Sequence, residues 1–132
     1  MAEPMQVEVV SAERVVWSGT SDNVIAMTVD GEIGILPGHS PVLSVLVPGV
    51  VVVFTEGNRE RIAVDGGFIS VNQGRVSVLS EYAELAEEIS TSEAEGELER
   101  ARQALDAGDG TEDDRKRFRR ATAQVRAAQS HR

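Results

Sequence analysis

Turn-forming residues interrupt the first 83 residues at short, regular intervals, and this spacing limits the segment to folds built from short strands. The turns are marked by Ser18-Gly19, Asp30-Gly31, Pro37-Gly38, Pro48-Gly49, Gly57-Asn58, Gly66-Gly67 and Gln73-Gly74. β-Branched residues, which favour strands, dominate the segments between them. We expect strands at residues 6–10, 14–17, 23–29, 34–36, 42–46, 50–55, 59–64, 68–71 and 75–79. Short strands with turns at such spacing are typical of a β-sandwich or barrel.

The pattern changes to that of helices near residue 90. Ser90-Thr91-Ser92-Glu93 matches a capping box, in which a hydroxyl accepts an early backbone N–H and the glutamate reaches back. Thr111 is placed to cap a second helix after Gly108 and Gly110, which are expected to end the first. Apolar residues recur at helical spacing at Ala94, Leu98, Ala101 and Leu105, and again at Phe118, Ala121, Val125 and Ala128. The sequence therefore predicts an antiparallel hairpin of two helices.

Charge is unevenly divided along the chain. The formal net charge of −9 argues against nucleic-acid binding, because such binding depends on neutralising phosphates. Residues 81–114 contain thirteen acidic residues, whereas residues 115–132 contain seven basic residues and no acidic one. Two interpretations are open: the basic helix pairs with the acidic helix inside the hairpin, or it docks on an acidic partner. The apolar faces of the two helices are thin and rich in alanine, which predicts a weakly held hairpin.

No sequence pattern points to catalysis, a metal or a cofactor. Cysteine is absent, and His39 and His131 are too far apart in sequence to form a spaced metal motif. Gly66-Gly67 lacks the Gly-Lys-Ser/Thr of a phosphate-binding loop and is interpreted as a tight turn. The longest apolar run, residues 45–54, is interrupted by Pro48-Gly49, so no membrane-spanning helix is expected. The start of the chain shows no targeting peptide, so the protein is expected to stay in the compartment where it is made.

Taken alone, the residues predict a β-domain and a helical hairpin that act by contact with other proteins. Three stretches of the sequence then indicate a resemblance to a known family. The stretch DGEIGILPGHSPVLSVLVPG, residues 30–49, closely resembles the signature of the epsilon subunit of bacterial F-type ATP synthases. Residues 7–19, VEVVSAERVVWSG, and residues 62–84, IAVDGGFISVNQGRVSVLSEYAE, resemble that family's opening and closing strands. The agreement covers the whole predicted sandwich in the expected order, whereas the helical half agrees in length and position only.

The resemblance implies an α+β fold: an antiparallel β-sandwich of about ten strands over residues 1–86, and a two-helix hairpin over residues 90–132. It implies a non-catalytic central-stalk subunit, bound to the gamma subunit and the c-ring, that couples proton-driven rotation to ATP synthesis. Membrane association would then occur only through the complex, at the cytoplasmic side of a bacterial cell membrane. The alternative is a free-standing β-sandwich binding module with a helical adaptor, but only 4% of the residues are aromatic.

The resemblance also implies contact residues. Glu32 and His39 occupy the positions that family members use to contact the c-ring. Residues 50–54 form an apolar strand without alternation, so this strand is either buried on both faces or covered by a partner. If a partner covers it, gamma is the natural candidate, and Val50, Val52 and Phe54 are expected to contact gamma.

The helical half departs from the family at a motif that binds ATP in many bacterial members, I/L-D-x-x-R-A. The matching residues here are Ile89, Ser90, Glu93 and Ala94, so a serine replaces the aspartate and a glutamate replaces the arginine. Because a glutamate repels phosphate where an arginine would pair with it, we expect no useful ATP binding. In some members the second helix inhibits ATP hydrolysis through basic residues that meet the beta subunits. The candidates for that contact are Arg115, Lys116, Arg117, Arg119, Arg120 and Arg126.

Overall fold

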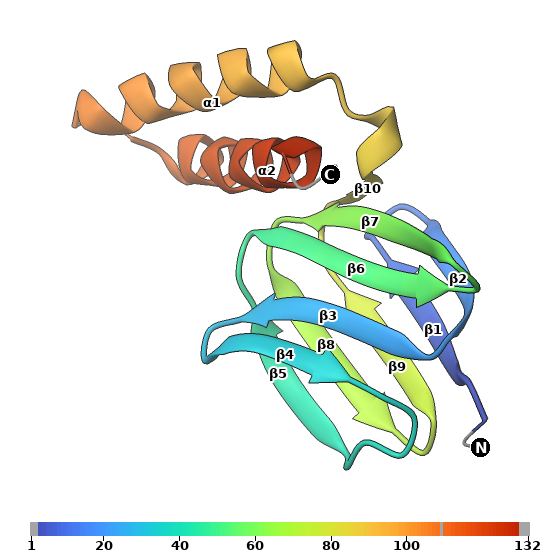
Figure 1. Cartoon of the computed structure of the whole chain (residues 1–132). Helices are drawn as coiled ribbons and strands as arrows, with labels where there is room; N and C mark the ends of the chain where they lie inside the picture. Colours follow the sequence, from blue (N-terminus) through green and yellow to red (C-terminus); the bar gives the residue numbers. More distant parts are fainter. Residues whose placement is uncertain (1–2, 109, 130–132) are drawn as a thin grey trace.

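The computed structural model describes residues 3–108 and 110–129, and within them a β-domain precedes a pair of helices (Figure 1). Residues 130–132 of the predicted hairpin, with His131, lie outside the described residues. The elements are β1 Met5–Val10, β2 Val15–Ser21, β3 Asn23–Thr28, β4 Gly31–Ile35, β5 Val42–Leu46, β6 Gly49–Thr55, β7 Asn58–Val64, β8 Gly67–Asn72, β9 Arg75–Leu79, β10 Ala83–Leu85, the 3-10 helix η1 Ala86–Glu88, α1 Thr91–Asp106 and α2 Glu112–Gln129. Every predicted strand is present, and β10 is added; its three residues are too few to show an alternating pattern.

The strands form one curved sheet that folds over on itself. Their hydrogen-bonded order is β10-β7-β6-β3-β5-β8-β9-β1-β2, with β4 paired to β3. Because β2, at one end of this order, contacts β6 and β10 near the other end, the sandwich is barrel-like. Paired strands within the described residues are antiparallel except β1 and β9, which are parallel. The α+β prediction is confirmed, and this pair is free to be parallel because no tight hairpin joins it.

The core of the sandwich is built from alternate residues along each strand. In β1, Met5, Val7 and Val9 are buried, whereas Gln6 and Glu8 between them are exposed. The cluster is completed mainly by aliphatic residues of the other strands, among them Val24, Ile35, Val51, Val53, Ile62, Ile69, Val76 and Val78. Full burial of such a side chain contributes about 1.5–3 kcal/mol. The sandwich therefore has a core that does not include the helices.

The turn between β7 and β8 requires glycine. Gly66 has a φ of 136° and Gly67 a φ of 100°. A β-carbon on Gly67 would lie 2.0 Å from the carbonyl oxygen of Leu79, so no larger residue fits without moving backbone. The prediction of a tight turn at Gly66-Gly67 is confirmed, and the turn places Asp65 beside the connection between β9 and β10.

The N-terminus of each helix is capped by the predicted residue. Ser90 Oγ accepts a hydrogen bond from the backbone N–H of Glu93 at 3.4 Å. At the start of α2, Thr111 Oγ1 accepts from the N–H of Asp114 and the Asp114 carboxylate accepts from the N–H of Thr111, both at 3.1 Å. This reciprocal arrangement satisfies donors that an uncapped helix would leave unpaired.

Helix α2 lies between α1 and the sandwich and buries a face toward each (Figure 1). Ala121 and Val125, which lie on the predicted apolar face of the second helix, are buried. A second face was not predicted. It forms an alanine seam made of Ala123 and Ala127 of α2, Ala63 of β7 and Ala86 of η1. This seam attaches the hairpin to the sandwich.

Candidate functional site

Glu32, a predicted c-ring contact, lies beside a turn stabilised by a side chain. Thr28 Oγ1 donates to the carbonyl of Gly31 at 2.7 Å and accepts from the N–H of Asp30 at 3.1 Å. Gly31 has a φ of 114°, which favours glycine. Glu32 follows on β4, opposite Met27 of β3, and its side chain is exposed. A carboxylate is thus presented to solvent on a backbone that is held in place.

His39, the second predicted c-ring contact, ends a tight turn. The backbone N–H of His39 donates to the carbonyl of Leu36 at 3.0 Å, and Gly38 between them has a φ of 88°. Pro37 followed by a glycine with positive φ is the signature of a type II turn. The Nδ1 atom of His39 lies 2.6 Å from the carbonyl oxygen of Ser40. Pro37 and Gly38 therefore form a turn that the fold needs, and this turn holds His39 in place.

Glu32 and His39 lie in different segments, Glu32 on β4 and His39 in the connection between β4 and β5. Within the described part of the chain, no hydrogen bond or ion pair joins the two side chains. The connection between β4 and β5, which contains His39, lies at the end of the sandwich away from the helices (Figure 1).

Strand β6 contains the apolar residues that were predicted to contact gamma, and the fold itself accounts for part of their apolar character. Val51 and Val53 point into the core, whereas Val50, Val52 and Phe54 are half-buried on the opposite face. Val50 packs against the alanine seam of α2, so the chain's own hairpin covers this end of the strand. Phe54 lies under the guanidinium of Arg59, which is 5.2 Å from the ring centroid.

A more exposed apolar surface lies elsewhere, and we call it the apolar stripe. It consists of Val29, Leu43, Val45, Phe68 and Leu79, which are 59, 70, 44, 49 and 52% exposed. Val45 is directly opposite Phe68, and Phe68 is opposite Leu79, so these side chains share one face of β5, β8 and β9. Sequence reasoning missed this surface, although the nearly continuous apolar stretch at residues 42–46 was a signal for it.

The basic residues of α2 have acidic or carbonyl partners in three places. Arg115 and Arg119 pair with Glu112 of the same helix, at 2.9 and 3.6 Å. Arg117 pairs with Glu97 of α1 at 2.6 Å and lowers the pKa of that carboxyl through a hydrogen bond.

The remaining three basic residues contact the sandwich. Lys116 pairs with Glu81, Arg120 with Asp65 and Glu81, and Arg126 donates to the carbonyl of Pro48. The expected pairing between the two helices is thus limited, among the described residues, to Arg117, because α2 also faces the sandwich.

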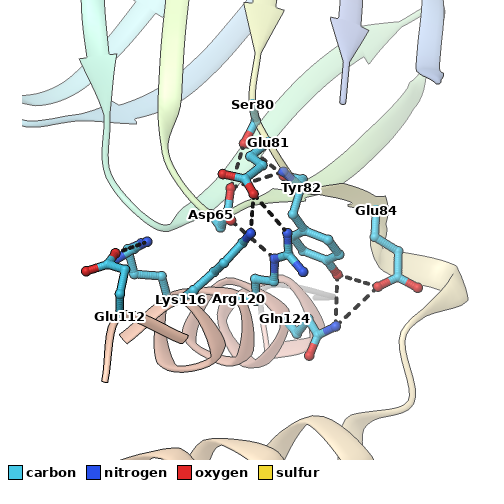
Figure 2. A network of polar contacts seen from close by, with 10 residues as sticks. Asp65, Ser80, Glu81, Tyr82, Glu84, Glu112, Lys116, Arg120 and Gln124 are labelled. Atoms are coloured by element: carbon cyan, nitrogen blue, oxygen red, sulfur yellow. Dashed lines mark hydrogen bonds and ion pairs between the residues drawn. The ribbon is translucent and has the colours of Figure 1, made fainter. Parts of the chain in front are cut away.

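Tyr82 joins the sandwich to α2 (Figure 2). Its hydroxyl donates to the Glu84 carboxylate and accepts from the side-chain amide of Gln124 at 2.9 Å. Burial, together with the hydrogen bond to Glu84, raises the pKa of Tyr82, so the phenol stays protonated at neutral pH. The guanidinium of Arg120 lies 5.4 Å from the Tyr82 ring centroid.

The residues that match the ATP motif line a cavity of about 520 Å³ at the start of α1. The lining contains Ile89, Ser90, Glu93 and Ala94, together with Glu84, Glu88, Glu97, Arg100 and Gln124. Four carboxylates face one guanidinium, so the surroundings disfavour a phosphate chain. Ser90, which replaces the aspartate of the motif, serves as the cap of α1.

No helix among residues 3–108 and 110–129 combines the length and the hydropathy that crossing a bilayer requires.

Comparison with known proteins assigns the chain to a family. Residues 4–86 match the family described as "ATP synthase, Delta/Epsilon chain, beta-sandwich domain". The ATP synthase epsilon chain of Thermobifida fusca is 47% identical, over 98% of this chain and 96% of that one. The epsilon chain of Cutibacterium acnes is 45% identical, over 84% and 77%.

A solved structure shares the fold. A chain of the Euglena gracilis mitochondrial ATP synthase, in a structure of its OSCP, F1 and c-ring, superimposes with a TM-score of 0.76 at 24% identity, covering 96% of this chain and 80% of that chain. The match thus includes the helices as well as the sandwich. The chain therefore belongs to the epsilon-chain family of the F-type ATP synthase, whose members are non-catalytic subunits of the central stalk.

Proposed function

We propose that this chain is the rotor subunit that transmits c-ring rotation to gamma in a bacterial, proton-driven ATP synthase, on the cytoplasmic side of the cell membrane. Membership of the epsilon-chain family supports this role and argues against a free-standing binding module. The related Euglena chain comes from an assembly that contains a c-ring. The protein acts by holding two partners in register, and its own chemistry is limited to contacts.

The apolar stripe is the observation that carries the proposal. Its five large apolar side chains, four on β5, β8 and β9 and Val29 just after β3, are each more than two-fifths exposed, and a contiguous patch of this kind marks an interaction site. Helix α2 packs on β6 and β7, whereas the large apolar side chains Leu43, Val45, Phe68 and Leu79 of β5, β8 and β9 stay exposed. The stripe fits gamma better than the β6 face, where Val50 is already packed against the chain's own helix.

The turns after β3 and β4 are the proposed contact with the c-ring. Glu32 supplies an exposed carboxylate, and His39 supplies an imidazole on a stiff Pro-Gly turn. Because these turns are ordered by their own hydrogen bonds, little further entropy is lost when they bind. Polar contacts of this type suit a wet interface with the polar loops of the ring.

The hairpin is proposed as a brake on ATP hydrolysis, through contact of the basic residues of α2 with acidic segments of the beta subunits. Support comes from the thin alanine seam, because alanines bury little apolar area and hold the hairpin weakly. With α2 displaced, Lys116, Arg120 and Arg126 would lose their sandwich partners and become available to another acidic surface.

Two matched substitutions test the gamma contact. Phe68→Glu places a charge in the apolar stripe, and Phe54→Glu makes the same change on β6. Loss of a central aromatic anchor costs about 2 kcal/mol or more, so we expect Phe68→Glu to raise the Kd for purified gamma roughly thirtyfold. Phe54→Glu should change it by less than about threefold. The reverse result would return the gamma contact to β6, and no effect of either would refute a gamma contact on these faces.

A further inference from the structure

Helix α2 is fastened to the sandwich by a polar network that centres on Asp65 (Figure 2). Asp65 follows β7 at the glycine turn and lies 55 residues before Arg120 in sequence. Its side chain is only 6% exposed, whereas that of Arg120 is 38% exposed. A carboxylate this buried is stable only when its oxygens have partners.

The partners of Asp65 are divided between its two oxygens. Oδ1 accepts from the hydroxyl of Ser80 at 2.9 Å and from the backbone N–H of Tyr82 at 3.2 Å, both within the sandwich. Oδ2 accepts from Nε of Arg120 at 3.4 Å and so points toward α2. The sandwich thus fixes the carboxylate in place, and the hairpin supplies the one cation that contacts it among the described residues.

Arg120 is held at the same time from two other sides. Its guanidinium lies over the Tyr82 ring, and its NH2 nitrogen is 3.6 Å from Glu81. Glu81 also pairs with Lys116, one turn earlier on α2. Several charge-assisted contacts therefore converge at one point of an interface whose fully buried apolar residues are alanines, with Val50, Tyr82 and Ile89 packed beside them.

We propose that the contact between Asp65 and Arg120 is the latch that holds the hairpin on the sandwich, and that it keeps Arg120 from any acidic partner while it is closed. The alanine seam supplies shape but little apolar area, so the polar contacts decide how often α2 detaches. The same guanidinium cannot serve Asp65 and a second carboxylate surface together. Opening the latch is thus the step that frees the basic face of α2; this consequence rests on the proposed brake.

The latch itself is tested on the isolated full chain. The protein has no cysteine, so Ala123→Cys introduces one reporter thiol in the buried seam. When labelling is slow compared with reclosing, its rate follows the population of the detached state. In this background, Asp65→Asn keeps an oxygen for Ser80 and Tyr82 but removes the charge that faces Arg120. Arg120→Gln removes the other partner at a partly exposed helix position outside the sandwich core, where failure to fold is not expected.

We expect both substitutions to speed labelling about tenfold, because charge-assisted hydrogen bonds of this kind are among the stronger ones. Arg119→Gln is the matched control: it removes one positive charge from α2, but the ion pair of Arg119 is with Glu112 of the same helix. Near-ultraviolet circular dichroism of Trp17, which packs on the sandwich core, checks that each variant is folded. Wild-type labelling rates in Asp65→Asn and Arg120→Gln would overturn the latch, and so would an equal gain in Arg119→Gln.

The consequence for the complex is tested by rebuilding the catalytic head and gamma with each full-length variant. Asp65→Asn opens the latch and leaves Arg120 intact, so it should slow ATP hydrolysis. Arg120→Gln opens the latch equally but also removes one of the basic residues proposed to contact the beta subunits, so it should slow hydrolysis less. If Asp65→Asn speeds thiol labelling but leaves hydrolysis unchanged, the latch stands and the proposed brake is refuted.

Discussion

A single charge reversal, Glu93→Arg, tests whether the acidic lining of the cavity at the start of α1 prevents nucleotide binding. Glu93 stands where the family motif has its arginine, and it lines the cavity with three further carboxylates and Arg100. Glu97, one of these carboxylates, has a lowered pKa because Arg117 donates a hydrogen bond to it, so it is ionised at neutral pH. A triphosphate, which is negatively charged, would therefore enter a site that also carries a net negative charge.

The expected magnitude follows from Coulomb's law. Two unit charges about 8 Å apart interact by about 2 kcal/mol at an effective dielectric constant near 20. Reversing Glu93 converts one such repulsion into an attraction, a change of about 4 kcal/mol before salt. Screening over a Debye length of about 8 Å reduces this to about 1.5 kcal/mol, or roughly a twelvefold lower Kd for ATP.

Isothermal calorimetry of the full chain with ATP measures this change. We expect no binding by the wild-type chain at micromolar ATP, and measurable binding by Glu93→Arg. Glu95→Arg is the matched control, because Glu95 is exposed on α1 and does not line the cavity. Micromolar binding by the wild-type chain would refute the reasoning. An equal gain in Glu95→Arg would show that net charge matters and the cavity does not.

Two further predictions concern the hairpin and the loops. Lys116 lowers the pKa of Glu81 below its ordinary 4.5, first through a hydrogen bond and then through its charge; Glu81 therefore stabilises the fold above that pH, and this contribution is lost as the pH falls through the lowered value. The difference in urea stability between wild type and Glu81→Gln should accordingly vanish in acid, and a pH-independent difference would contradict the ion pair. Cysteines at Glu32 or His39 should cross-link to the c-ring in the assembled complex, whereas a cysteine at Asp113 on α2 should not. A cross-link from Asp113 alone would place the c-ring beside the hairpin and refute the proposed contact.

Local patterns were sufficient to predict nine of the ten strands and both α-helices of this fold. Strand positions, the two capping residues Ser90 and Thr111, and the turn at Gly66-Gly67 all follow from interactions within a few residues. The type of turn before His39 is equally local, since Pro37 and Gly38 restrict their own backbone angles. Such features are decided by neighbours in the chain and can therefore be read from neighbours in the sequence.

The surfaces were predicted less well, because they depend on which element covers which. The apolar run at residues 50–54 indicated a partner-covered face, and Val50 is indeed covered, but by α2 of the same chain. The apolar stripe passed unnoticed because its members come from strands that only the sheet order brings together. Its contact with gamma, like that of Glu32 and His39 with the c-ring, stays a prediction.

The sequence by itself determined the two-part architecture and, through the signature at residues 30–49, the family. Only the tertiary structure decided what the charges of α2 do. Lys116, Arg120 and Arg126 find their partners in the sandwich, at sequence separations of 35 residues (116 minus 81), 55 and 78. A run of basic residues indicates that acidic partners are needed, but it does not indicate which ones. Packing selects the partners, because Coulomb attraction in water acts effectively only over about one Debye length. Asp65 is a partner for Arg120 because the glycine turn places its buried carboxylate within that reach.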